Sequence, residues 1–293
     1  MEGKAATEEM LCTYEYGIER GEQMASFVND NVGNLANKRG LDLGCGLGGI
    51  SIAFARECDY LVSGDIIIDR IGPAKKRFEE LSVGNISSMC IDSLSLCFKD
   101  NSFDFVIMNG LIEWVGTKPG KETPTELQKL ALTEVRRILK NDGFVYIATE
   151  NRWYPSHFIK DPHVHMPLVA VVPRWLANAI ASIYNKNPYR VYLYSYWKLK
   201  KLILESGYNH TKFFLPFFQR PPAYILHGQD GQQSAPGPQV NSHGRSLHRV
   251  WLILRRLQFD ALLTPHAGHL GLLQSGEGIP ARSMYTADRP LPG

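Results

Sequence analysis

Up to about residue 217, two patterns of apolar and polar positions take turns along the chain. Short apolar runs that end in Asp, Asn, Ser or Gly predict buried strands. Between them, apolar residues recur three and four positions apart, as Met24, Phe27 and Val28 do, which predicts amphipathic helices. The predicted strands are residues 41–43, 60–65, 86–91, 103–108, 144–149 and 209–217, and the predicted helices are residues 18–32, 49–57, 69–81, 124–139, 173–183 and 195–206. Strands that alternate with helices in this way are typical of an α/β fold with a doubly wound, mostly parallel sheet.

A glycine-rich stretch, Leu-Asp-Leu-Gly-Cys-Gly-Leu-Gly-Gly at residues 41–49, joins the first predicted strand to the helix of residues 49–57. Glycine permits φ > 0 in a sharp turn and lets a ligand approach the main chain closely. The N-terminus of the following helix presents unpaired N–H groups and the positive end of its dipole. The stretch therefore predicts a small-molecule site. The alternative is a turn that only lets the helix pack on the strand.

Two ligand classes fit this stretch. Gly44, Gly46 and Gly49 match the dinucleotide fingerprint G-x-G-x-x-G, which is weak support when it stands alone. Asp42 favours the other class, because a carboxylate repels a pyrophosphate and attracts a ligand that carries an ammonium and a sulfonium. The alternative function is an NAD-dependent oxidoreductase that uses the same three glycines together with Asp65.

Residues 41–46, Leu-Asp-Leu-Gly-Cys-Gly, resemble the first motif of the class I S-adenosylmethionine-dependent methyltransferases. Further matches follow in the family's order: Asp65 ends the second strand, Asp92 follows the third, and Phe103-Asp104 opens the fourth. The resemblance implies a Rossmann-like sheet and S-adenosylmethionine as cofactor, with Asp65 on the ribose hydroxyls and Asp92 on the adenine amino group. The cofactor-binding residues expected on this basis are Asp42, Gly44, Cys45, Gly46, Gly48, Asp65, Ile66, Asp92, Ser93 and Asn109.

The range of possible methyl acceptors is reduced by two motifs that the sequence lacks. Residues 109–112, Asn-Gly-Leu-Ile, lack the Asp/Asn-Pro-Pro-Tyr tetrapeptide of one class of amino-methylating enzymes, and no Pro-Cys nucleophile for cytosine C5 methylation lies nearby. A small-molecule, lipid or sugar acceptor remains, with a hydroxyl favoured, and the methyl group would move by direct SN2 transfer. Orientation of the reactants can supply much of the rate enhancement, so a nucleophile or metal motif is not required. A non-catalytic partner protein that keeps the fold is the other alternative.

A long apolar insertion, about residues 153–194, interrupts the pattern after the fifth strand and predicts a cap over the acceptor pocket. His163 and His165 are the candidate general bases, because imidazole accepts protons near neutral pH. In an extended segment, residues two apart point to the same side, so both could face the pocket. The alternative is that either histidine caps a turn beside a neighbouring proline. Glu150 is the next candidate base.

The C-terminal part has a different composition. Lysine is absent after Lys212, and Gly, Pro, Gln and Ser become frequent. We therefore expect a methyltransferase domain in residues 1–227 and an irregular, flexible tail in residues 228–293. The fold also requires a seventh, antiparallel strand, and residues 223–226 are the one segment that the pattern offers for it.

Composition excludes several other classes. A net charge of +3 without a run of basic residues gives no reason to expect nucleic acid as a partner. The five cysteines have no metal-ligand spacing, so no metal is expected, and reduced thiols indicate a cytoplasmic protein. Residues 1–12 are expected to fray, and residues 1–10 lack the apolar core of a signal peptide. Peripheral membrane contact through the apolar cap and the oligomeric state stay open.

Overall fold

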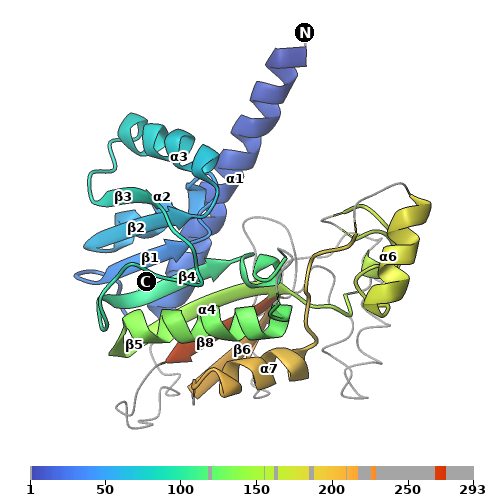
Figure 1. Ribbon diagram of the computed structural model, residues 1–293. Coiled ribbons are helices and arrows are strands. Elements are labelled where there is room, and N and C mark those ends of the chain that lie inside the picture. The colour runs from blue at the N-terminus through green and yellow to red at the C-terminus, as the bar shows by residue number, and fades with distance from the viewer. Residues whose placement is uncertain are drawn as a thin grey trace, which may run out of the picture.

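The computed structural model of the protein describes residues 2–117, 121–154, 156–161, 164–184, 188–208, 210–216, 226–228 and 268–274. Within these residues one sheet of eight strands has the order β3-β2-β1-β4-β5-β8-β6-β7 (Figure 1). The strands are β1 Arg39–Leu43, β2 Tyr60–Asp65, β3 Ile86–Cys90, β4 Phe103–Asn109, β5 Leu139–Glu150, β6 His210–Pro216, β7 Leu226–Gly228 and β8 Gly268–Gln274. The strands from β3 to β5 are mutually parallel, which confirms the predicted doubly wound fold.

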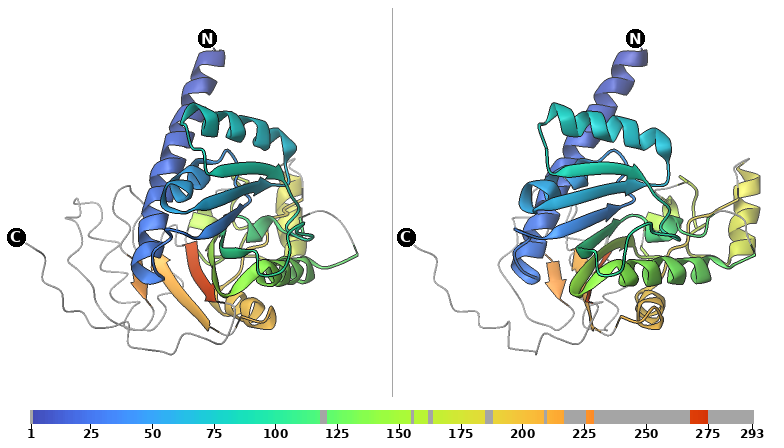
Figure 2. Two further views of the ribbon diagram at one scale, coloured as in Figure 1. Left: turned by 90° about the vertical axis from the view of Figure 1, so that its left-hand side faces the viewer. Right: turned by 60° about the vertical axis from the view of Figure 1, so that its left-hand side comes forward.

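Helices cover both faces of this sheet. The helices are α1 Glu2–Asn31, α2 Gly49–Glu57, α3 Ile68–Glu80, η1 Ile112–Trp114, α4 Pro124–Ile138, α5 Ser156–Ile159, α6 Arg174–Ile183 and α7 Tyr196–Glu205. On one face α1 and α2 pack on the sheet through Val28 and Phe54, and α3 packs on α2. On the other face α4 and α7 bury Leu132 and Leu199 against the strands. Figure 2 shows these two layers from the edge of the sheet.

Helix α1 is longer than the sequence pattern predicted. The first twelve residues were expected to fray, but the helix begins at Glu2. Its first turns extend away from the sheet in Figure 1. The segment is rich in Ala, Glu, Met and Leu, which are strong helix formers, so it continues the helix that is packed on α2. Amphipathic periodicity gives little signal there, because acidic and small residues dominate the first eight positions.

Helix α4 begins as its sequence predicts. The side chain of Thr123 accepts a hydrogen bond from the backbone N–H of Glu126, and the carboxylate of Glu126 accepts one from the N–H of Thr123 at 2.7 Å. Pro124 occupies the first helical position, where its missing N–H costs nothing. The other end differs from the prediction, because residues 141–143 are part of β5 and not a separate turn. The pairing of β5 with β4 shifts register there, between Phe103 and Phe105.

The C-terminal region contributes a strand that the sequence analysis missed. Strand β8 lies between β5 and β6 and is antiparallel to both. Residues 223–226 were the segment expected to supply a seventh, antiparallel strand. Residues 223–225 lie outside the described residues, and Leu226 begins β7, which is antiparallel to β6. The β8 segment contains two glycines and is paired on both sides, so it has no alternating pattern that would identify it. Because β8 lies beyond residue 227, the prediction that residues 228–293 form a wholly irregular tail was wrong for this strand.

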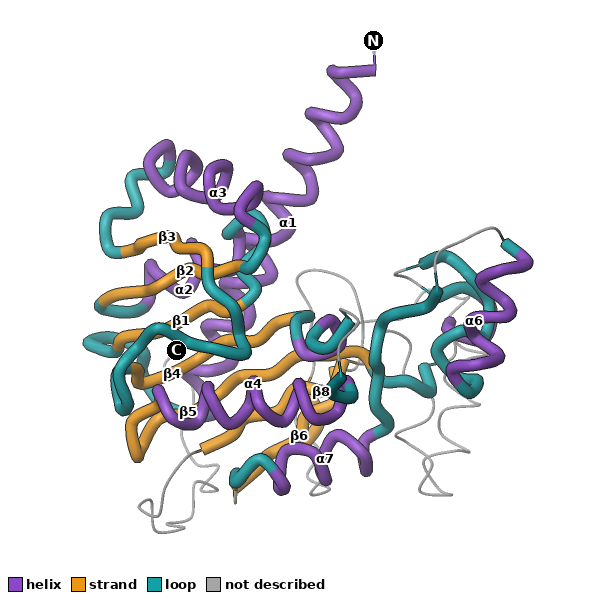
Figure 3. The backbone as a smooth tube through the Cα atoms, viewed as in Figure 1, coloured by secondary structure: helices purple, strands orange, loops and turns teal. Residues whose placement is uncertain are grey.

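The predicted cap has an apolar cluster of its own. The buried residues of the cluster are Met166, Val169, Ala170, Ala177, Ala181, Tyr189, Val191 and Leu193. Figure 3 shows this segment and α6 beyond the carboxyl ends of β4 and β5. Arg152 fastens it to the sheet, since its guanidinium donates to the carbonyl oxygens of Ala170, Val171 and Val172. Among the described residues, no helix is both long and apolar enough to span a membrane.

Candidate active site

A cavity of about 600 Å³ opens at the carboxyl ends of β1, β2, β3 and β4. This is the edge of a doubly wound sheet at which ligands bind. The lining residues are Leu43, Gly44, Asp65, Ile66, Ile67, Arg70, Ile91, Asp92, Ser93, Leu94, Gly110, Leu111, Trp114, Val115, Gly116, Thr117 and Leu127. Half of the predicted cofactor residues are among them, namely Gly44, Asp65, Ile66, Asp92 and Ser93.

Asp65 is the buried acid of this cavity, with 3% of its surface exposed. One carboxylate oxygen accepts the N–H of Gly46 at 2.9 Å, and the other accepts the N–H of Ile67 at 2.9 Å. Arg70, which also lines the cavity, lies 3.3 Å from the first of these oxygens. Each carboxylate oxygen has a second lone pair, so the group can also accept hydrogen bonds from a ligand. The glycine-rich loop and α3 thus fix this carboxylate at the end of β2.

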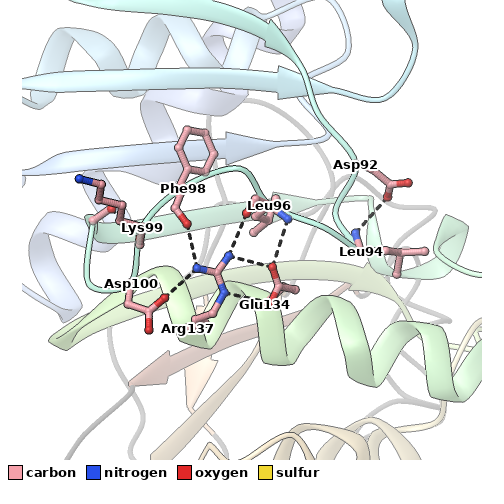
Figure 4. Close-up of polar contacts among 9 residues, drawn as sticks. Asp92, Leu94, Leu96, Phe98, Lys99, Asp100, Glu134 and Arg137 are labelled. Atoms are coloured by element: carbon pink, nitrogen blue, oxygen red, sulfur yellow. Dashed lines mark hydrogen bonds and ion pairs between the residues drawn. The ribbon is translucent and has the colours of Figure 1, made fainter.

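The loop that carries Asp92 and Ser93 is held in place by α4 (Figure 4). The guanidinium of Arg137 donates to the carbonyl oxygens of Leu96 and Phe98, each at 2.8 Å. It also bonds to Glu134, and this hydrogen bond lowers the pKa of the Glu134 carboxyl. Asp92 itself accepts the N–H of Leu94 at 3.0 Å. Arg137 is therefore a positioning residue for the loop after β3, which lines the cavity through Asp92, Ser93 and Leu94.

Three other predicted cofactor residues of the glycine-rich loop do not line the cavity, namely Cys45, Gly46 and Gly48. Gly48 is the residue before α2 and has φ = 81°, and a Cβ there would lie 2.6 Å from the ring of Phe78. Glycine is therefore required at this position. Gly46 uses its N–H on Asp65. Burial raises the pKa of the Cys45 thiol to about 12, so the thiol stays neutral.

Asp42 does not line the cavity, although the sequence analysis gave it the deciding role. Its carboxylate is 2% exposed and accepts the hydroxyl of Ser51 in α2 at 2.5 Å. The Ser51 hydroxyl also lies 2.9 Å from that of Ser63 in β2. Burial raises the pKa of Asp42 to about 7. Direct contact between Asp42 and a cationic cofactor stays a prediction.

We expect Asp42→Asn to remove a pH-dependent loss of stability. The pKa of Asp42 lies near 7 in the folded protein, against the ordinary aspartate value of 3.8 that holds in the unfolded chain. Between these limits the folded state keeps a proton that the unfolded state has released, so the free energy of unfolding falls as the pH rises. The full difference is about 4 kcal/mol at 1.36 kcal/mol per pKa unit. Urea denaturation should show the variant matching the wild type near pH 4 and exceeding it at pH 8.

The exposed Asp69→Asn serves as the control for this comparison, because Asp69 lies on the solvent side of α3. It should follow the wild type at both pH values. A constant difference between Asp42→Asn and the wild type across the range would show that Asp42 is ionised throughout.

Asn109, the last predicted cofactor residue, ends β4 directly before Gly110 of the cavity. Its side-chain oxygen accepts a hydrogen bond from Arg20 of α1 at 2.9 Å. Glu113, which is buried, accepts a hydrogen bond from the hydroxyl of Thr149 at 2.9 Å. Arg20 was missed by the sequence analysis, because nothing in the helix pattern shows that it reaches a strand 89 residues away.

The predicted bases are placed differently. His163 lies outside the described residues. His165 is exposed, has φ = 57°, and donates its N–H to the carbonyl oxygen of Asp161. Residue 165 therefore belongs to a turn and not to the extended backbone that was expected there. Their catalytic role stays a prediction.

An acid–imidazole pair, Glu150 and His157, lies at the carboxyl end of β5. The Nε2 atom of His157 is 3.1 Å from a carboxylate oxygen of Glu150, and its Nδ1 atom is 3.2 Å from the carbonyl oxygen of Arg152. His157 is fully buried, and the Glu150 side chain is 31% exposed. Glu150 was a candidate base from the sequence. His157 was not, because its contact with Glu150 depends on the turn after β5.

A family model described as "Methyltransferase domain" matches residues 41–147. The chain contains a methyltransferase domain. The matched span runs from β1 into β5 and carries the whole described lining of the cavity. The predicted family, the enzyme class and S-adenosylmethionine as cofactor are thereby confirmed. The match favours a methyltransferase over the NAD-dependent oxidoreductase.

Solved structures share the fold at low identity. An S-adenosylmethionine-dependent methyltransferase of Thermotoga maritima, named a possible histamine N-methyltransferase, has a TM-score of 0.51 at 15% identity, covering 92% of this chain and 95% of its own. A chain from the complex of the Trm112 methyltransferase activator and a methyltransferase of Haloferax volcanii has a TM-score of 0.53 at 12% identity, covering 95% and 97%. Phosphoethanolamine N-methyltransferase 1 of Haemonchus contortus, in complex with phosphoethanolamine and S-adenosylhomocysteine, has a TM-score of 0.50 at 15% identity, covering 89% and 43%. No curated protein sequence matches the chain.

Proposed function

We propose that the methyltransferase domain binds the adenosine part of S-adenosylmethionine in the cavity at the carboxyl ends of β1 to β4. The observation that carries this proposal is the buried carboxylate of Asp65 at the end of β2, fixed by two backbone N–H groups and facing the cavity. It suits the two vicinal ribose hydroxyls, which need an acceptor. Asp92 and Ser93 then meet the adenine ring, and Ile66 supplies an apolar wall.

We expect Asp65→Ala to weaken S-adenosylhomocysteine binding by about 1.5–3 kcal/mol, the contribution of hydrogen bonds to a charged group. Isothermal titration calorimetry measures this change, with NAD as a second ligand and Asp69→Ala, at an exposed acid of α3 that does not line the cavity, as the control. Unchanged affinity in Asp65→Ala would remove this carboxylate from the site. Binding of NAD in place of S-adenosylhomocysteine would restore the oxidoreductase alternative.

For the second substrate we propose a hydroxyl group on a small molecule, lipid or sugar, methylated by direct SN2 transfer. The sulfonium is an activated leaving group, so the protein has to align the nucleophile, exclude water and take up a proton. The cap beyond β4 and β5 supports an enclosed acceptor, and the Glu150–His157 pair supports proton uptake at the same edge. A lipid acceptor, with peripheral membrane contact by the cap, is supported by Trp175 and Ile183 of α6, which are 73% and 79% exposed.

The acceptor class can be tested with methyl-labelled S-adenosylmethionine and a panel of alcohols, sugars and dispersed lipids. Histamine and phosphoethanolamine belong in the panel as amine arms, since two of the similar structures are named for these amines. Transfer to amines alone would overturn the hydroxyl proposal. We also propose a cytoplasmic location, supported by the free thiols of Cys45, Cys58, Cys90 and Cys97 in the described part of the chain.

A further inference from the structure

Helix α6 has no charged side. On one side it is buried in the apolar cluster of the cap through Ala177 and Ala181. The exposed residues of the helix are Trp175, Ala179, Ser182 and Ile183. They are spaced three or four positions apart, so they share one side of the helix, which we call the outer side of α6. A helix that is uncharged all round is normally covered on every side, so the outer side is a candidate docking surface.

The one charged residue of this helix, Arg174, is turned toward the cap. Its guanidinium donates to the carbonyl oxygen of Val191 at 2.9 Å and to that of Tyr189. The central carbon of the guanidinium also lies 4.0 Å from the centre of the Tyr192 ring. These contacts fasten the start of α6 to the rest of the cap and leave the outer side without a charge.

The exposed charges of the cap have one sign. Residues 151–194 contain five basic residues and one acidic residue, whereas the whole chain has a net charge of +3. The acidic residue is Asp161, which is fully buried and accepts the hydroxyl of Tyr189 at 3.0 Å. Lys160 and Arg190 are exposed. Among the described residues of the cap, the surface therefore carries cations and no carboxylate.

The position of α6 leaves its outer side accessible to a large, flat partner. The helix stands away from the sheet in Figure 1 and in the right-hand view of Figure 2. Figure 3 places it beyond the carboxyl ends of β4 and β5. A protruding helix can rest on a fluid surface, which needs no pocket of matching shape.

The chemistry of this surface fits a bilayer that contains anionic lipids. Tryptophan is favoured at the level of the lipid headgroups, where Trp175 would lie. Aliphatic side chains such as Ile183 enter the boundary between headgroups and acyl chains. Anionic headgroups attract Lys and Arg, and a surface with no exposed carboxylate is not repelled by them.

We propose that the outer side of α6 docks on the surface of a bilayer containing anionic lipids. The inference deepens the membrane contact of the proposed function by giving it a lipid class, and it does not depend on which acceptor is methylated. The competing explanation is that an acidic protein covers the outer side of α6.

Sedimentation of the full-length protein with vesicles tests this docking. We expect the wild type to bind vesicles of phosphatidylcholine and phosphatidylglycerol about 10- to 30-fold more tightly than vesicles of phosphatidylcholine alone, the effect of two basic residues near the surface. The double variant Trp175→Ser/Ile183→Ser should bind the anionic vesicles at least about 10-fold more weakly, because two apolar side chains no longer leave water. Trp197→Ser is the matched control, since Trp197 of α7 is 72% exposed and lies outside the cap. It should bind as the wild type does.

Added salt should weaken the binding to anionic vesicles, because it screens exposed charges. Equal binding to the two kinds of vesicle overturns the proposal, as does an equal loss in Trp197→Ser. A wild type that sediments with neither kind of vesicle also overturns it and favours a protein partner.

Titration of the same proteins with S-adenosylhomocysteine separates this inference from the proposed function. The double variant should bind this ligand as the wild type does, which also shows that it is folded. A wild type that binds the ligand and no vesicle overturns the docking alone. A wild type that binds anionic vesicles and no ligand contradicts the proposed function and supports the docking.

Discussion

A chain that ends at residue 227 is expected to lose its cooperative fold. The truncation removes β8, which pairs with seven residues of β5 and five of β6. Strand β6 then has no strand that connects it to β5, and only the side-chain packing of α7 against α4 and the strands still holds this segment to the sheet. Each backbone hydrogen bond contributes about 0.5–1.5 kcal/mol net, so two lost ladders remove much of a typical stability of about 5–15 kcal/mol.

The measurement is thermal unfolding followed by circular dichroism, with S-adenosylhomocysteine binding as the second readout. A chain that ends at residue 276 keeps β8 and is the matched control, which should unfold cooperatively. If the shorter chain unfolds cooperatively and binds the ligand, β8 is dispensable and the domain limit predicted at residue 227 holds.

The second large effect concerns proton uptake, where we expect Glu150→Gln to lower methyl transfer by about 10²–10⁴-fold, the usual contribution of a general base. Ala148 lies opposite Asn109 in the sheet, so Glu150 is just beyond the end of β4. The ring nitrogens of His157 face a carbonyl oxygen and the Glu150 carboxylate. The carbonyl oxygen and the carboxylate both accept hydrogen bonds. When His157 carries a single N–H, one of these two contacts has no proton, so the Glu150–His157 pair can take up one more. The amide of glutamine removes that capacity and keeps the shape.

Single-turnover rates with the acceptor found in the labelled panel measure this loss, and affinity for S-adenosylhomocysteine should not change. His163→Ala and His165→Ala are the parallel variants, because both were predicted as bases from the sequence. A fall of the same size in either one, with Glu150→Gln active, assigns the proton to the cap histidine. Glu79→Gln, an exposed acid on α3, should leave the rate unchanged.

Local patterns were sufficient to predict which acidic residues lie at the cavity. Asp65, Asp92 and Ser93 stand directly after short apolar strands, and parallel strands bring their carboxyl ends to one edge. The position of each residue along the chain therefore gave its position in the fold. The capping box of Thr123 and Glu126 likewise depends on neighbours three residues apart, and it set the start of α4.

Long-range partners could not be predicted in this way. The direction of the Asp42 carboxylate depends on Ser51 of α2, whose hydroxyl donates a hydrogen bond to it. Strand β8 exists because β5 and β6 offer free edges on both sides, and its own residues carry little β pattern. Arg20 acquires its place through the close contacts of Gly17 and Gly21 in α1 with α2. In each of these cases the deciding interaction joins segments that the sequence does not show to be adjacent.

The separate apolar cluster of the cap has an evolutionary consequence. It shares no residue with the clusters on the two faces of the sheet. Under the proposed function, substitutions in the cap change the surroundings of the second substrate while the packing beneath the glycine-rich loop is preserved. Selection on the second substrate and selection on the methyl donor then act on different parts of the chain. Among proteins that share the glycine-rich loop and the strands around it with this one, the amino-acid sequence is expected to differ first in the cap.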